Sequence, residues 1–108
     1  MRIDDYQNTA KTTAIYPQEH KILYPALGLA GEAGEVANKV KKIIRDGVQN
    51  MQPDWKQQLA AEIGDVLWYC AVLADDLNMS LSTLAAQNLE KLERRKEQGT
   101  LQGSGDKR

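Results

Sequence analysis

The sequence is poor in the residues that most often carry covalent or redox chemistry: it has one cysteine, Cys70, and one histidine, His20. A single cysteine excludes an intrachain disulfide, and Cys70 lies in an apolar stretch typical of a small core residue. A lone histidine in an expected loop leaves no Ser/His/Asp set, so catalysis by a nucleophilic side chain is disfavoured. Any reaction must therefore use other groups.

An excess of charge and long apolar runs are absent as well. Fourteen Lys and Arg face fifteen Asp and Glu, and the formal net charge is −1. This balance gives no electrostatic reason to expect nucleic acid or an anionic membrane as a partner. No run approaches 18 apolar residues, and the polar start MRIDDYQNTA has no apolar signal segment. We therefore expect a cytoplasmic protein that binds neither nucleic acid nor membrane.

The alternation of apolar and polar residues that marks strands is missing, whereas helical periodicity runs through most of the chain. Leu29, Val36 and Val40, for example, follow spacings of seven and four residues on one face. We predict an all-α, four-helix bundle-like fold with one helical domain over residues 1–98 and a flexible Gly-rich tail over 99–108. The expected helices cover about residues 3–14, 23–45, 55–78 and 81–97.

Local signals mark the ends of these helices. Gly47 and Gly99 are typical of the positions where helices stop. Asp54 and Ser80 are candidate N-caps of the helices that follow them.

Two pairs of acidic residues are spaced three apart on the second and third expected helices: Glu32 with Glu35, and Glu62 with Asp65. Residues at this spacing share a helix face, so two facing helices would bring four carboxylates together. Such a cluster repels itself, and a hard cation that prefers oxygen ligands, such as Mg²⁺, relieves the repulsion. The alternative is that each pair is ordinary solvated surface.

Glycines accompany both acidic pairs. Gly34 and Gly64 lie inside the pairs, and Gly28 and Gly31 lie one turn before the glutamates of the first pair. Each interior glycine costs a helix roughly 1 kcal/mol relative to alanine. We expect these glycines to clear space for a bulky ligand or for a partner helix; close helix packing alone is the other explanation.

The fourth expected helix carries a complementary face, on which Asn88, Lys91 and Arg95 follow spacings of three and four. Amide and cationic groups opposite a metal cluster suit a polyphosphate. An exposed, charged helix end is the alternative for this segment.

The blocks LGLAGEAGEVANKVKK, EIGDVLWY and NLEKLERRKEQGTLQGSGDKR together resemble the MazG-like family of all-α NTP pyrophosphohydrolases. The resemblance implies hydrolysis of nucleoside triphosphates to the monophosphate and pyrophosphate, dependent on Mg²⁺ or Mn²⁺, by dimers or tetramers. It implies metal ligation by the two acidic pairs and phosphate binding by Asn88 and Lys91. Tyr69 corresponds to the family's tyrosine one turn after the last acidic ligand. The resemblance does not fix the base.

For mechanism, we expect a metal-activated water to attack the α-phosphorus, with Glu35 as the favoured general base. Trp55, beside an expected loop, is the favoured surface for the base, whereas Trp68 has the surroundings of a core residue. Two alternatives stay open: an all-α dUTPase or dCTPase with narrow base choice, and a non-catalytic helical module that binds metal. A di-iron bundle normally needs Glu-x-x-His pairs, which are absent.

Overall fold

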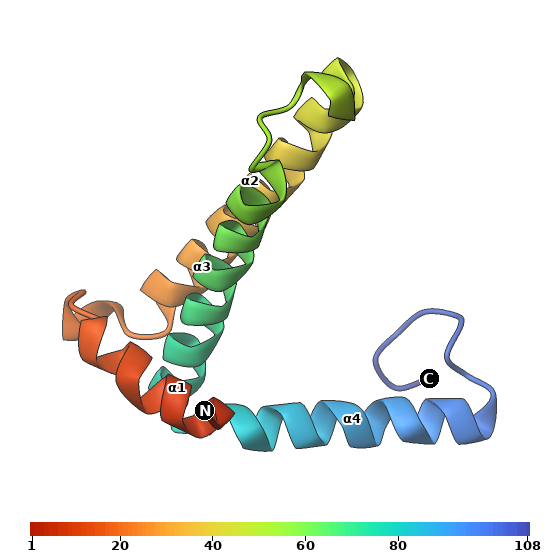
Figure 1. Ribbon diagram of the computed structural model, residues 1–108. Helices are drawn as coiled ribbons and strands as arrows, with labels where there is room; N and C mark the ends of the chain where they lie inside the picture. Colours follow the sequence, from red (N-terminus) through yellow and green to blue (C-terminus); the bar gives the residue numbers. More distant parts are fainter.

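The computed structural model describes residues 1–108 and contains four α-helices, three short 3₁₀ turns and no strands (Figure 1). The all-α prediction is confirmed. The helices are α1 (Ile3–Ala10), α2 (Leu23–Asp46), α3 (Trp55–Asp76) and α4 (Leu81–Gln98). No helix is both long enough and apolar enough to cross a membrane.

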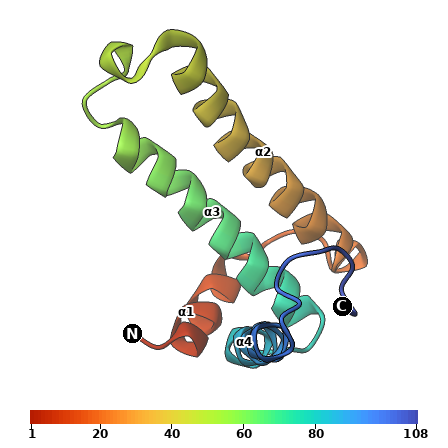
Figure 2. The same cartoon turned by 90° about the vertical axis from the view of Figure 1, so that its right-hand side faces the viewer.

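Helices α2 and α3 form a long antiparallel hairpin, which is the main packing unit of the molecule (Figures 1 and 2). The hairpin turns where the sequence predicts: Gly47 has φ +85°, and its N–H donates to the Ile43 carbonyl at 2.8 Å. Residues other than glycine rarely adopt this backbone conformation, so glycine is the residue that ends α2 here.

The core lies at the base of the hairpin, where α1 and the start of α4 meet α3. Its fully buried apolar members are small or aliphatic, and half-buried aromatic and aliphatic side chains surround them. Buried Gln7 joins three segments: its Nε2 donates to the carbonyls of Ala71 and Met79, and its Oε1 accepts from Leu81 N–H, each at 3.0 Å. The cluster consists of Ala10, Ala71, Ala74 and Leu81.

Helix α4 points away from the hairpin as a separate arm and packs mainly against α1 and α3, near its own first turns (Figures 1 and 2). The predicted N-cap of α4 is confirmed, because Ser80 Oγ accepts a hydrogen bond from Thr83 N–H at 3.2 Å. Asp4 of α1 also binds this helix end, accepting from Ser82 N–H at 3.0 Å and from Ser82 Oγ at 2.6 Å. The four helices therefore do not close into the expected bundle within one chain.

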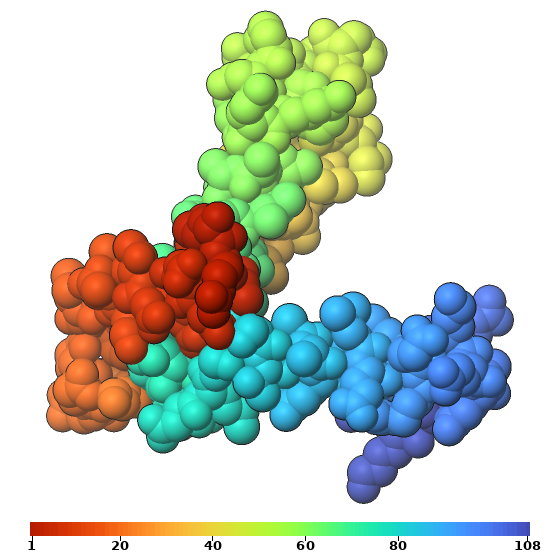
Figure 3. Space-filling model, turned by 60° about the horizontal axis from the view of Figure 1, so that its bottom comes forward, coloured from red at the N-terminus to blue at the C-terminus, as the bar shows by residue number.

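The molecule is open for its length. Its radius of gyration is 17.0 Å, whereas a compact chain of this length has about 13 Å. Only 8 of 108 residues are buried, and the space-filling view shows the arm of α4 standing clear of the rest (Figure 3). Much apolar surface is left uncovered by the single chain.

Two local predictions need correction. The first helix ends at Ala10 and continues only as a 3₁₀ turn to Thr13, not as an α-helix to residue 14. Asp54 makes no N-cap hydrogen bond, because its Oδ1 accepts instead from the Gln58 side-chain amide at 2.8 Å. The expected ends at Gly99 and Ser80 are confirmed, with Gly99 in the left-handed conformation at φ +68°.

Candidate metal centre

Three of the predicted acidic residues converge between α2 and α3. Glu32 of α2 and Glu62 and Asp65 of α3 each place a carboxylate oxygen within 4.8 Å of the others. The spacing of three puts Glu62 and Asp65 on one face of α3, and the antiparallel pairing brings Glu32 opposite them. Glu35 is exposed and is not part of this group.

The electrostatics of the cluster reflect this crowding. The pKa of Glu32 is raised, first by desolvation, then by a hydrogen bond with Glu62 and by the negative charges of Asp65, Glu62 and Glu35. One cationic side chain forms an ion pair with the cluster: Lys39 Nζ lies 3.8 Å from Glu62 Oε1. Oxygen donors whose charges repel one another are the donor set that a hard divalent cation stabilises. The residues present therefore fit such an ion.

Tyr69 lies beside the cluster. Burial raises the pKa of its phenol, with further contributions from Tyr24, Glu32 and Asp65. Its ring occupies the space beside Gly28: a Cβ built on Gly28 would lie 2.1 Å from a Tyr69 ring carbon. Gly28 thus accommodates an aromatic ring of the same chain, a role that the sequence pattern did not specify.

The other glycines near the acidic residues face open space. A Cβ built on Gly31, Gly34 or Gly64 would meet nothing within 4 Å. Within one chain they accommodate no neighbour, so these three positions remain available to a ligand or to a partner helix.

The basic face of α4 does not reach the acidic cluster within the chain. α4 packs mainly against α1 and α3, and its last turns lie far out on the arm (Figures 1 and 2). Lys91 and Arg95 bind Asp106 of the tail instead, and Asn88 is exposed. The predicted juxtaposition of phosphate-binding groups and acidic residues is therefore absent from a single subunit.

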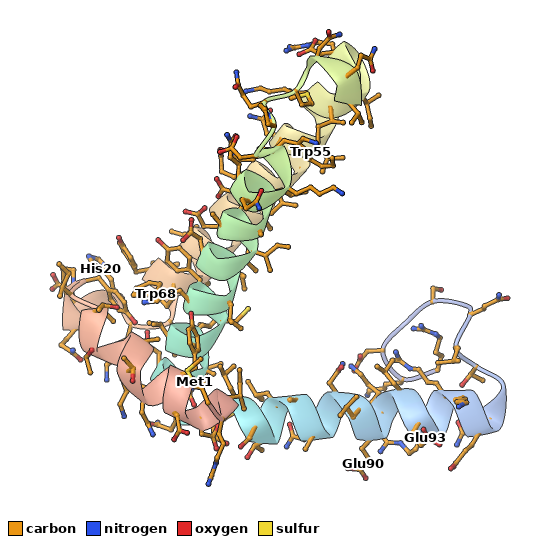
Figure 4. The ribbon with its side chains drawn as sticks, viewed as in Figure 1. Met1, His20, Trp55, Trp68, Glu90 and Glu93 are labelled. Carbon is orange, nitrogen blue, oxygen red and sulfur yellow. The ribbon has the colours of Figure 1, made fainter.

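Trp55 begins α3 near the turn of the hairpin, whereas Trp68 lies near the hairpin base (Figure 4). Trp55 lines a pocket of about 220 Å³ together with Lys39, Lys42, Ile43, Met51, Gln58 and Leu59. Trp68 packs against the core cluster, and its indole N–H donates to Thr13 Oγ1 at 2.8 Å. Trp68 therefore has a structural position, and Trp55 borders an open site.

Two residues near the candidate groups were missed from the sequence. Lys39 belongs to a basic run that is most simply solvated surface, and only the pairing of α2 with α3 places it beside Glu62. Asp106 lies in the tail, and no periodic pattern links it to Lys91 and Arg95. In both cases the contact depends on tertiary structure, so spacing offers no signal.

The fold and the site define an all-α protein whose two central helices bring three carboxylates together. Residues 18–100 match the MazG nucleotide pyrophosphohydrolase domain, and the chain belongs to this family. It is also similar to the Gene 37 protein of Mycobacterium phage L5, with 48% identity over 114 residues and complete coverage of both chains. No solved structure gives a significant match.

Proposed function

We propose that the protein is a Mg²⁺-dependent nucleoside triphosphate pyrophosphohydrolase. Water attacks the α-phosphorus, the bond between that phosphorus and the oxygen bridging to the β-phosphorus breaks, and the products are a nucleoside monophosphate and pyrophosphate. The convergence of Glu32, Glu62 and Asp65 within 4.8 Å carries the proposal, together with membership of the family.

Glu32, Glu62 and Asp65 would hold the ion, and Lys39 would leave Glu62 and become free to meet a phosphate oxygen. When bound, Mg²⁺ polarises the phosphates and lowers the pKa of bound water. Glu35 lies one helical turn from Glu32 and outside the three-carboxylate group. A carboxylate that is not fully engaged as a ligand is the better proton acceptor, so we assign the general base to Glu35.

A second copy of the chain completes the site in this proposal. The chain exposes 7962 Å², whereas a compact protein of its mass exposes roughly 6,000 Å². For two chains this excess is about 4,000 Å², which lies within the total of roughly 2,000–5,000 Å² that obligate homodimers bury. Because α4 projects as an arm, its Asn88, Lys91 and Arg95 can approach the acidic cluster of a neighbouring subunit, where they would bind the phosphates.

Trp55 is the proposed surface for the base. Its pocket also contains Lys39, whose ammonium group lies 3.8 Å from Glu62 Oε1, so Lys39 borders both the pocket and the acidic cluster. Seven residues separate Trp55 from Glu62, a rise of about 10 Å along α3, which suits the span from phosphate to base. Stacking on one aromatic ring is worth roughly 1–3 kcal/mol.

Tryptophan fluorescence tests the base site with a non-hydrolysable NTP analogue and Mg²⁺. We expect Trp55→Leu to weaken binding roughly fivefold or more and to remove the fluorescence change, while Trp68→Leu keeps the ligand-induced change. Unaltered affinity and an unaltered signal in Trp55→Leu would place the base elsewhere.

The activity is tested with the eight common NTPs and dNTPs and with dUTP, with and without Mg²⁺ or Mn²⁺, by measuring pyrophosphate release. We expect release that depends on the metal and is lost on chelation. Release from only one pyrimidine dNTP would favour the dUTPase or dCTPase alternative. Metal binding without any release from the whole panel would identify a non-catalytic helical module instead.

A further inference from the structure

The C-terminal tail folds back along α4 (Figure 1). Residues of the tail and of α4 line a polar cavity. The cavity has a volume of about 430 Å³ and no apolar residue in its lining. Three of its cationic side chains come from α4 and two from the tail. They are Lys91, Arg94, Arg95, Lys107 and Arg108.

One carboxylate, that of Asp106, lies among these cations. Lys91 Nζ donates to Asp106 Oδ1 at 2.7 Å, and Arg95 Nη2 donates to the Asp106 carbonyl at 2.7 Å and to its Oδ1 at 3.4 Å. Lys91 first, and Arg95 with it, lowers the pKa of Asp106. The carboxylate thus holds the position that an anion would take between two cationic donors.

Arg95 has a hydrogen-bond donor without an acceptor, which an anion in the cavity could satisfy. The residue is only 7% exposed, yet its Nε has no hydrogen-bond partner. A buried guanidinium N–H without an acceptor is costly, and charge-assisted bonds to phosphate oxygens are among the strongest that arginine makes. One carboxylate cannot meet every donor here, whereas a chain of phosphates offers many more acceptor oxygens.

The contacts of the tail allow Asp106 to leave the cavity. Arg108 holds its curve by donating to the carbonyls of Thr100, Leu101 and Gly105 at 2.7–3.1 Å. Gly103 and Gly105 both have positive φ, and the Asp106 side chain is 79% exposed. Although Arg95 is buried, the Asp106 carboxylate is largely solvated, and solvent weakens its ion pairs with Lys91 and Arg95. A ligand with more charge can therefore displace Asp106.

We propose that this cavity is a polyphosphate site in which Asp106 takes the place of a phosphate group until the ligand displaces it. Lys107 and Arg108 then add to the binding. The inference rests on the proposed function in taking a substrate triphosphate as the natural occupant, and it assigns the tail an autoinhibitory contact with Lys91 and Arg95.

Calorimetric titration with tripolyphosphate in the absence of metal tests this directly. We expect Asp106→Asn to bind about two- to fivefold more tightly than the native chain, as exposed charge pairs allow. Glu93→Gln is the matched control, because it removes the same charge from α4 on the face away from the tail (Figure 4) and should change little. A chain ending at Leu101 should bind less tightly than Asp106→Asn, because it also lacks Lys107 and Arg108.

Equal affinities of the native chain and Asp106→Asn, or no binding by either, would overturn the inference. If a chain ending at Leu101 binds as tightly as Asp106→Asn, then Lys107 and Arg108 do not contribute to ligand binding. The backbone amide of Gly105 gives an independent readout by NMR, since ligand should shift its native signal towards that of Asp106→Asn. If Asp106→Asn binds more tightly but no variant hydrolyses an NTP, the tail inference stands and the proposed function fails.

Discussion

At the scale of single residues, the three converging carboxylates lower the stability of the metal-free protein, and they would raise it only with a bound cation. Desolvation and neighbouring charges raise the pKa of Glu32, which means that its charged form is disfavoured where it lies. A bound cation would reverse this balance. The proposed metal binding would therefore raise the stability of the protein.

Replacing Glu62 with alanine tests that link. We expect Glu62→Ala to lower turnover by at least about 100-fold, the upper range for groups one shell further from a metal. Its melting temperature without metal should be unchanged or higher, because mutual repulsion is removed, and Mg²⁺ plus nucleotide should no longer raise it. Thermal melting and pyrophosphate release measure both effects, with exposed Glu93→Ala as the control. Near-normal turnover in alanine variants of Glu32, Glu35, Glu62 and Asp65 alike would show that the metal assignment is wrong.

Gly28 and Gly31 differ in their surroundings and predict opposite effects on stability. Gly28→Ala forces a Cβ into the Tyr69 ring, and crowding of this kind typically costs about 1–3 kcal/mol. Gly31→Ala meets nothing within the chain, so the better helix propensity of alanine should stabilise α2 by up to about 1 kcal/mol. Urea unfolding of both variants measures the difference. A Gly28→Ala variant as stable as Gly31→Ala would show that Tyr69 does not occupy this position.

At the scale of elements, the base of the molecule depends on polar contacts between α1 and the start of α4. Asp4 accepts two hydrogen bonds from Ser82, at a helix N-terminus where backbone N–H groups lack partners and the dipole favours negative charge. An acidic residue in the first turn of α1 therefore serves the N-terminus of another helix. This contact fixes where the arm begins.

The same contact predicts a pH dependence. The hydrogen bonds with Ser82 lower the pKa of Asp4 below its ordinary value of 3.8, so the stabilisation is complete above that value and is lost as pH falls through the lower, folded-state pKa. We expect Asp4→Asn to melt at a lower temperature than the native chain at pH 5–8. The gap should shrink below about pH 4. Asp5→Asn, which removes the neighbouring charge without a contact to α4, is the control. A gap that is constant down to pH 2 would contradict the assignment.

At the scale of the whole molecule, the chain leaves an apolar groove uncovered between α3 and α4. The groove has a volume of about 440 Å³, and every residue that lines it is hydrophobic, including Leu67, Cys70, Leu73 and Leu77. It adjoins the small core, and Leu77 is 45% exposed. A second copy that covers the groove would supply the buried apolar area that one chain lacks.

Light scattering at micromolar concentration should therefore return at least twice the chain mass of 12.1 kDa. We expect Leu77→Glu to lower the mass towards the monomer and to lower activity, while Ile15→Glu, at a loop residue that is 93% exposed, changes neither. Circular dichroism shows whether each variant keeps its helices. A monomer mass for the active native enzyme would refute the proposed assembly, and with it the completion of the site by a second α4.

The sequence alone determined the features that arise from short-range physics. Helix ends at Gly47, Ser80 and Gly99 depend on backbone conformation and capping within a few residues. The shared face of Glu62 and Asp65 follows from the helical period, so the acidic site was also predictable. All four helices and most of the acidic cluster belong to this class. The division into one helical domain over residues 1–98 and a flexible tail over 99–108, and the roles of the site residues, stay predictions.

Only the tertiary structure decided the features that join distant residues. The arm direction of α4 depends on the turn before it, where Asn78 has φ +60° and where Gln7 and Asp4 hold the start of the helix. Periodicity shows which side of a helix is apolar, but not which way the helix points. For the same reason the sequence predicted Lys91 and Arg95 as binding residues but not their contact with Asp106. Contacts across a turn depend on a few dihedral angles and on the groups that happen to be brought together there, and these leave no repeat in the sequence.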